Sequence, residues 1–136
     1  MPTIFEKLNL KLDKSIVVLN APESFEAELA QLSHVNIVRA IGKTKTITFA
    51  LVFVKTKAEL DALSAKLADK AEGDALLWFA YPKKTSKKYQ CEFNRDKGWD
   101  AIRRAGFDSV RMVAIDEDWS ALRFRRVEFI KSVKRD

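Results

Sequence analysis

The chain has 136 residues, of which 47% are hydrophobic and 32% charged, and its net charge is +6. This composition is typical of a folded globular domain and excludes an intrinsically disordered chain, which has far fewer apolar residues. One cysteine and one histidine exclude an internal disulfide and a Cys- or His-rich zinc site. The longest nearly uncharged run, Ile47–Val54, is too short to cross a bilayer.

The amino terminus lacks the charged and apolar regions of a signal peptide, so cytoplasmic residence is expected. No repeat, low-complexity tract or linker divides the sequence. We therefore expect one domain over residues 1–136, with residues 131–136 as a disordered tail.

The positive charge is concentrated in two segments. Residues 83–97 contain six lysines and arginines against two acidic residues, and residues 123–136 contain the same numbers. This asymmetry favours an anionic partner, either a small anionic molecule or an acidic protein. Nucleic acid, which is also anionic, is an alternative partner, although the sequence has no nucleic-acid recognition motif. A membrane partner is not expected.

The amino-terminal part predicts a short helix, a strand and a second helix. Thr3 and Glu6 have the spacing of a capping box, which predicts a helix through Leu8. Ile16–Leu19 is a continuous apolar run typical of a strand buried on both faces. A helix is expected after it, because Pro22 suits a first helical turn and apolar residues recur at helical spacing: Phe25, Leu29 and Leu32.

The middle of the chain predicts two strands followed by a long helix. Val35–Ile41 and Phe49–Val54 are the two apolar strand segments. Thr56 and Glu59 form a second capping box, and the helix is expected to stop at Gly73, which suits a left-handed helix end. The apolar stripe of this helix is Leu60, Leu63, Leu67 and Ala71.

The carboxyl-terminal part predicts a strand, a helix and a hairpin. Ala75–Tyr81 is the fourth strand, and Asn94 is a candidate cap for a helix that ends at Gly106. Phe107–Ile115 and Trp119–Val127 flank an acidic turn and predict a β-hairpin. The inward residues of the helix are Trp99 and Ile102.

Strands that alternate with helices imply parallel pairing and right-handed crossovers. We therefore predict an α/β fold, a three-layer sandwich with a mostly parallel mixed sheet that ends in an antiparallel C-terminal hairpin. The join between Ile41 and Phe49 leaves one alternative open, because its seven residues contain no helix and a parallel crossover usually needs a dozen or more. In that alternative, Val35–Ile41 and Phe49–Val54 form a hairpin and the strand order changes.

The order of these elements resembles a known fold. Phe49–Val54 looks like the fourth strand, Leu76–Pro82 like the fifth, and Gly106 to Phe124 like the closing antiparallel hairpin of the S-adenosylmethionine-dependent methyltransferases. The resemblance covers about residues 15–127 if one crossover unit is missing. It implies a Rossmann-like sheet, and it makes a residual methyltransferase one functional alternative.

Two positions depart from that family. The turn after the family's first strand is glycine-rich, which lets the backbone approach the cofactor, whereas this chain has Leu19-Asn20-Ala21-Pro22 there. An acidic residue that closes the family's second strand holds the ribose, whereas Ala40-Ile41-Gly42 stands here. We therefore expect no S-adenosylmethionine bound in the usual way, and no other cofactor.

Three strings are similar to a family of small uncharacterised bacterial proteins, a domain of unknown function. They are Val18–Pro22, Leu77–Lys84 and Ile115–Phe124. Because this family has no assigned reaction, the resemblance implies a fold and leaves the function unknown.

The best candidate site is the lysine-rich loop that follows the fourth strand. Ligands of open α/β sheets gather outside the carboxyl ends of the parallel strands. Lysine ammoniums and neighbouring hydroxyls suit a phosphate or carboxylate there, although the glycines of a P-loop are absent. The candidate ligand-binding residues are Asn20, Tyr81, Lys83, Lys84, Thr85, Ser86 and Trp119, with Lys55 and residues 116–118 on the same rim.

Other chemistry-bearing residues have structural interpretations. Three consecutive acidic residues, 116–118, suit a turn better than a metal site, and ion pairs between this turn and Lys83 or Lys84 are an option. Cys91 has no evident base beside it, and His34 is alone, so no catalytic or metal-binding residue is predicted. Arg123 and Arg125 alternate with apolar residues, a pattern typical of a half-buried edge strand whose basic face could contact nucleic acid.

The leading hypothesis is a non-catalytic or degenerate α/β module that binds an anionic ligand or an acidic partner at the strand-end rim. The alternatives are nonspecific nucleic-acid binding and a residual methyltransferase. The hypothesis requires Tyr81 and Trp119 to lie at the same end of the sheet.

Overall fold

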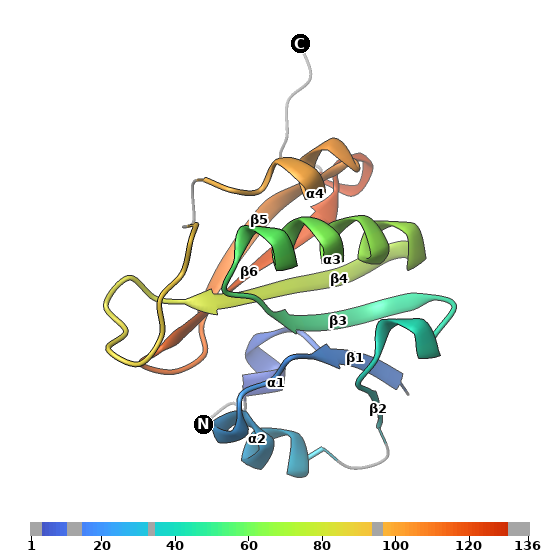
Figure 1. Ribbon diagram of the computed structural model, residues 1–136. Helices are drawn as coiled ribbons and strands as arrows, with labels where there is room; N and C mark the ends of the chain where they lie inside the picture. The colour runs from blue at the N-terminus through green and yellow to red at the C-terminus, as the bar shows by residue number, and fades with distance from the viewer. Residues whose placement is uncertain (1–3, 11–14, 33–34, 94–96, 131–136) are drawn as a thin grey trace.

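The computed structural model describes residues 4–10, 15–32, 35–93 and 97–130. A six-stranded sheet carries helices on both faces (Figure 1). The strands are β1 (Ser15–Leu19), β2 (Asn36–Val38), β3 (Ile47–Phe53), β4 (Ala71–Pro82), β5 (Phe107–Ala114) and β6 (Trp119–Arg126). The helices are α1 (Ile4–Lys7), α2 (Glu26–Ala30), α3 (Lys57–Lys70) and α4 (Asp100–Arg104), with 3-10 turns η1 (Glu23–Phe25), η2 (Ile41–Lys43) and η3 (Val127–Phe129). None of the described helices is long and apolar enough to cross a membrane.

The sheet has the strand order β2-β1-β3-β4-β6-β5. β1 pairs in parallel with β2 and β3, and β3 pairs in parallel with β4. β6 is antiparallel to both β4 and β5. The predicted three-layer, mostly parallel sheet with a C-terminal hairpin is confirmed.

The alternative hairpin between the second and third strands is wrong, because β1 lies between β2 and β3. Residues 39–46 make this crossover with η2 and no α-helix. To reach β3 from β2, the connection must cross two strand spacings, about 10 Å, and return along a strand of only three residues. Eight residues are long enough for this path. If β3 is matched to the fourth strand of the methyltransferase fold, as the resemblance implies, the missing crossover unit falls between β2 and β3.

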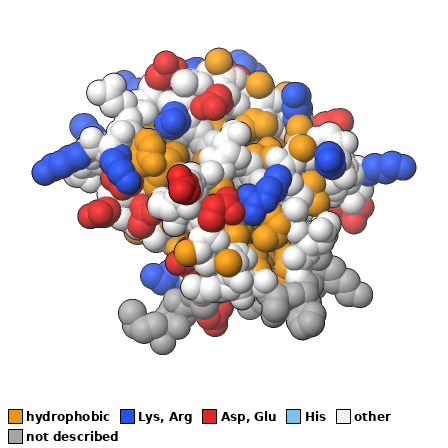
Figure 2. All heavy atoms as spheres, turned by 60° about the horizontal axis from the view of Figure 1, so that its bottom comes forward, with side chains coloured by type: hydrophobic (Ala, Val, Ile, Leu, Met, Phe, Trp, Pro, Cys, Tyr) orange, Lys and Arg blue, Asp and Glu red, His pale blue; other side chains and the backbone are white. Residues whose placement is uncertain are grey.

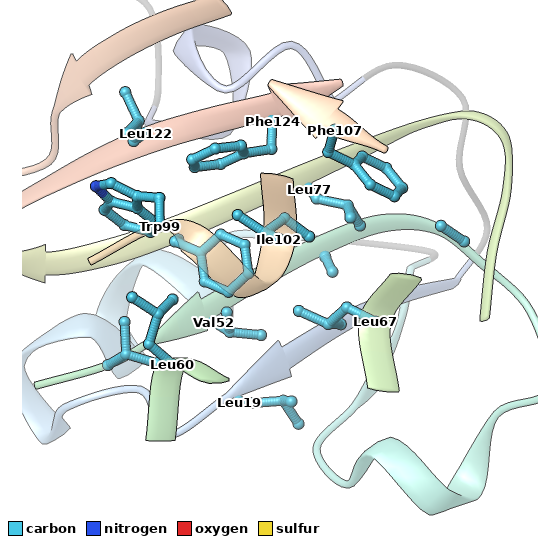
Figure 3. Close-up of a cluster of buried hydrophobic side chains, with 14 of the residues drawn as sticks. Leu19, Val52, Leu60, Leu67, Leu77, Trp99, Ile102, Phe107, Leu122 and Phe124 are labelled. Atoms are coloured by element: carbon cyan, nitrogen blue, oxygen red, sulfur yellow. The ribbon is translucent and has the colours of Figure 1, made fainter. Parts of the chain in front are cut away.

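One core lies between the sheet and the helices α3 and α4. Leu60 and Leu67 of α3 and Ile102 of α4 are completely buried, and Trp99 is nearly so. Figure 3 shows these side chains pointing toward those of the sheet strands. Burial of each large aliphatic side chain stabilises the fold by about 1.5–3 kcal/mol, so this stripe holds α3 on the sheet.

The opposite face of the sheet is covered by α1, η1 and α2. Phe25 and Leu29 pack there against the strands, together with Phe5 of α1. The indole nitrogen of Trp78 donates a hydrogen bond to the carbonyl of Leu8 at 2.9 Å, which fastens the end of α1 to β4. β3 lies between the two cores, which explains its almost uninterrupted apolar sequence.

Several element boundaries differ from the predictions. The helix α3 ends at Lys70 and Ala71 turns directly to extended backbone, so Gly73 (φ +57°) lies within β4 and is not the helix stop. β2 covers only three residues of the predicted Val35–Ile41. β6 lies between β4 and β5, so the prediction of an edge strand at Arg123 and Arg125 is wrong, and β5 is the edge.

The capping box at Thr56 is confirmed, with the side-chain oxygen of Thr56 accepting from the Glu59 amide and Glu59 accepting in return. Thr3, His34, Asn94 and the tail 131–136 lie outside the described residues. Figure 2 shows one side of the molecule, on which acidic and basic side chains are intermixed and hydrophobic ones are exposed between them.

Candidate functional site

The carboxyl end of β4 and the beginning of β6 form one side of the site. Tyr81 pairs with Ser120 and Pro82 pairs with Trp119 across the two antiparallel strands. Tyr81 and Trp119 therefore lie at the same end of the sheet, as the leading hypothesis requires. The loop after β4 leaves this end of the sheet (Figure 1).

The lysine loop is attached to the acidic turn by backbone and hydroxyl groups. The Lys83 amide donates to the Asp118 carbonyl at 2.7 Å, and the Ser86 hydroxyl donates to the Asp118 carboxylate at 2.8 Å. Asp116 accepts from the amides of Asp118 and Trp119, which is the turn chemistry expected of these residues. Among the described residues, no ion pair joins this turn to Lys83 or Lys84.

The second half of the loop folds back onto the sheet. The Glu92 amide donates to the Lys55 carbonyl at 3.1 Å, and the Glu92 carboxylate accepts from the Lys57 amide at 2.9 Å. The Lys55 ammonium lies 5.4 Å from the centre of the Tyr89 ring. These contacts place residues 89–93 opposite residues 83–86.

A hollow of about 800 Å³ lies between the two halves of the loop. Tyr81 and Ser120, which are strand residues, form part of its wall. Its charged lining is three lysines and Glu92, whose carboxylate already accepts a backbone hydrogen bond. The complete lining is Tyr81, Pro82, Lys83, Lys84, Ser86, Tyr89, Gln90, Cys91, Glu92, Phe93, Lys97 and Ser120.

Ser120 is the buried polar group of this hollow. Its exposed fraction is 8%, and its hydroxyl has no hydrogen-bond partner among the described residues. Lys83 and Lys84 likewise form no ion pair with the described carboxylates. A hydroxyl donor and two ammonium groups thus remain available to a ligand.

The Cys91 side chain lines the hollow. Burial is the main cause that raises its pKa above the ordinary value of a cysteine. Because the thiolate is the nucleophilic form, the geometry offers Cys91 no activation.

The predicted site residues divide into three groups. Tyr81, Lys83, Lys84 and Ser86 line the hollow. Thr85 lines a second depression of about 470 Å³ with Lys87, Lys88, Glu117 and Asp118. Asn20 follows β1, outside the hollow, and Trp119 is 3% exposed and packs against Phe53 and Tyr89.

Sequence reasoning missed the contributions of Pro82, Tyr89–Phe93, Lys97 and Ser120. The position of Ser120 follows from the hairpin register, since it lies opposite Tyr81. Nothing in the sequence indicates that residues 89–93 return to the sheet, because the hydrogen bonds of Glu92 that bring them back join residues far apart in the chain.

The topological switch point lies elsewhere, between the carboxyl ends of β1 and β3. The chain leaves β1 toward α2 on one face of the sheet and leaves β3 toward α3 on the other. Asn20 adopts φ +59°, the left-handed conformation that favours glycine, and its amide donates to the Phe53 carbonyl at 3.3 Å. The Asn20 side chain therefore joins the ends of β1 and β3.

The end of β2 has the opposite charge from the methyltransferase pattern. β2 ends at Val38, so the residue that follows it is Arg39, and not Ala40-Ile41-Gly42 as predicted. Arg39 forms two hydrogen bonds to the Glu26 carboxylate, at 2.8 and 2.9 Å, and these bonds lower the pKa of Glu26. A paired cation in place of a carboxylate, and an asparagine side chain across the first turn, do not fit S-adenosylmethionine bound as in that family.

Comparison with known proteins identifies the fold. No family model matches the sequence, and no curated protein matches it either. Among solved structures, a SAM dependent methyltransferase from Aquifex aeolicus is similar with a TM-score of 0.57 and 12% identity, over 91% of this chain and 88% of that one. A putative type 11 methyltransferase from Sulfolobus solfataricus has a TM-score of 0.54 and 10% identity, over 99% and 93%.

A Methanococcus jannaschii fibrillarin, described as a pre-rRNA processing protein, has a TM-score of 0.55 and 11% identity, over 85% of this chain and 67% of that one. At these identities the likeness shows the fold alone. The distant resemblance to a truncated methyltransferase fold is confirmed, and the resemblance to the small bacterial family finds no counterpart in these comparisons.

Proposed function

We propose that the protein binds a small phosphorylated molecule in the hollow at the carboxyl end of β4, without activating a nucleophile of its own. The observation that carries the proposal is the lining: three lysines and the Ser120 hydroxyl, for which the described residues offer no hydrogen-bond partner, surround a space of about 800 Å³. This volume lies within the range of small-molecule sites, about 300–1,000 Å³.

The lining also indicates the chemistry of the ligand. Lysine ammoniums supply point charges for phosphate oxygens, and the Ser120 hydroxyl supplies a directed hydrogen bond. The aromatic rings of Tyr81, Tyr89 and Phe93 provide apolar surface for the remainder of the molecule. A phosphate ester with a planar organic part, such as a nucleoside monophosphate, matches both halves of this lining.

Isothermal calorimetry with adenosine monophosphate and with pyrophosphate tests the proposal. The double variant Lys83→Gln, Lys84→Gln should weaken binding by about 10- to 100-fold, because hydrogen bonds to charged groups contribute about 1.5–3 kcal/mol each and these are partly exposed. The matched control is Lys87→Gln, Lys88→Gln, which removes the same charge from the same loop outside the hollow. Equal loss in the two double variants, or no heat with either phosphate, refutes the proposal.

A residual methyltransferase is the second candidate, and the fold of the structural neighbours is what favours it. The residues at Asn20 and Arg39 argue against it, as described above. Calorimetry with S-adenosylmethionine at millimolar concentration separates the two functions. Heat that is abolished by Asn20→Trp and unchanged by the lysine variants would favour the methyltransferase over the phosphate site.

A further inference from the structure

Three arginines lie together on the hairpin, on the side of the sheet that carries Trp78. Arg111 of β5 is directly opposite Arg123 of β6, and Arg123 is in turn opposite Trp78 of β4. Arg125 lies two residues further along β6 and therefore on the same face. We call Arg111, Arg123 and Arg125 the arginine face.

The arginine face has fewer carboxylates than guanidinium groups. Asp74 accepts from Arg125 at 2.6 and 2.8 Å, and these hydrogen bonds are the main cause that lowers the pKa of Asp74. The guanidinium groups of Arg111 and Arg123 form no hydrogen bond or ion pair with the described residues. The neighbouring Asp108 contacts Arg103 at 3.5 Å.

Arg123 is held in an unfavourable environment. Its Nε atom is buried without a partner, and it faces Arg111 directly across the strand pair, where like charges destabilise a sheet. Desolvation is the main cause that lowers its pKa, and Arg125 and Arg111 add to the effect. A bound anion would supply the missing acceptor and relieve the repulsion between the guanidinium groups.

We propose that the arginine face binds the phosphodiester backbone of single-stranded nucleic acid. The guanidinium fork matches two phosphate oxygens, and arginines two residues apart on a strand are spaced by about 7 Å, which suits a ligand of repeated charges. A protein partner would need an apolar anchor at the centre of the patch, whereas Arg123 occupies the centre of this one. Because the phosphates of the backbone are the same in every sequence, this binding is independent of sequence.

This surface is separate from the hollow. Asp74 and Arg125 lie toward the beginning of β4, and the hollow lies at its end. The two proposals therefore fail independently, because the variants that test one leave the residues of the other unchanged.

Fluorescence anisotropy with labelled 20-nucleotide oligothymidylate and oligouridylate, from 50 to 300 mM salt, tests the proposal. Each phosphate contact contributes about 0.7 to the slope of log affinity against log salt for single strands. The double variant Arg111→Gln, Arg123→Gln should reduce this slope by about 1.4 and weaken binding at least tenfold at 50 mM salt. The matched control is Arg104→Gln, Lys66→Gln, which removes two charges from exposed positions on α4 and α3.

Equal affinity for the two oligonucleotides supports recognition of the backbone, whereas a more than tenfold preference for one of them would mean that the 2′-hydroxyl or the thymine methyl group is read and would count against it. If the double variant does not fold, Arg111→Gln alone, at an exposed position, should reduce the slope by about 0.7. The proposal is overturned by absence of binding at 50 mM salt or by the same slope change in the control. It is also overturned if polyglutamate displaces the probe more effectively than unlabelled oligonucleotide, because the partner is then an acidic protein.

Discussion

Two buried tryptophans differ in whether the indole nitrogen has a hydrogen-bond acceptor, and a pair of substitutions can test this difference. Trp78 and Trp119 are 1% and 3% exposed. The indole nitrogen of Trp78 donates to the Leu8 carbonyl at 2.9 Å, whereas the indole nitrogen of Trp119 is buried with no acceptor. Replacement by phenylalanine removes the same atoms at both positions, so the loss of apolar contact and the resulting cavity are similar.

The hydrogen-bonding contributions have opposite signs. Trp78→Phe leaves the carbonyl of the fully buried Leu8 without its donor, at a cost of about 1–3 kcal/mol. Trp119→Phe removes a buried unsatisfied donor and recovers about the same amount. Trp78→Phe should therefore lower the free energy of unfolding by about 2–6 kcal/mol more than Trp119→Phe does.

Urea unfolding followed by far-ultraviolet circular dichroism measures both values, provided that the two variants have the same denaturant slope. A larger loss for Trp119→Phe, or equal losses, would refute the assignment of the two indole nitrogens. Such a result would also mean that Leu8 is not fastened to β4 as described.

Three further predictions concern single residues. Thr56→Ala should lower the free energy of unfolding by about 1 kcal/mol in urea titrations, because it removes the acceptor of the helix cap. Asn20→Gly should change the free energy of unfolding by less than about 0.5 kcal/mol, because glycine relieves the strain of the left-handed backbone and so offsets the lost hydrogen bond to Phe53. Asn20→Ala loses the same hydrogen bond without that relief and should cost about 1–2 kcal/mol, so equal costs for the two variants would contradict the explanation. The lowered pKa of Asp74 means that its pair with Arg125 stabilises the fold above the unfolded pKa of about 4 and that this effect is lost as pH falls through the folded pKa. The deficit of Asp74→Asn, under about 1 kcal/mol at pH 7, should therefore shrink steadily in unfolding curves recorded at successively lower pH from about 4 downward.

The strands and the hairpin could be predicted because their residues are determined locally. The apolar run of β3 requires burial on both faces, and the alternation in β6 separates Leu122 and Phe124 from the arginines. The position of β6 within the sheet could not be predicted from that alternation. An edge strand and an interior strand with one uncovered face have the same pattern, and only the pairing with β4 distinguishes them.

The candidate site was predictable at its strand end and not in its loop. Tyr81 and Lys83 follow a buried strand, so the carboxyl-end rule for open α/β sheets locates them. The opposite wall depends on Glu92, whose amide and carboxylate bond to backbone more than 30 residues away. The acidic segment could be interpreted as a turn because the Asp116 carboxylate accepts hydrogen bonds from the amides of Asp118 and Trp119. Such bonds join residues close together in the sequence, so the residue types alone indicate them.

Binding of a phosphate group in the hollow after β4 can be followed by NMR, from the amide chemical shifts during titration with adenosine monophosphate. We expect saturable shifts at Lys83, Lys84, Gln90–Phe93 and Ser120, with Asn20 and Arg39 unchanged. Shifts confined to Lys87 and Lys88, or shifts at Asn20 and Arg39 without any at Ser120, would contradict it.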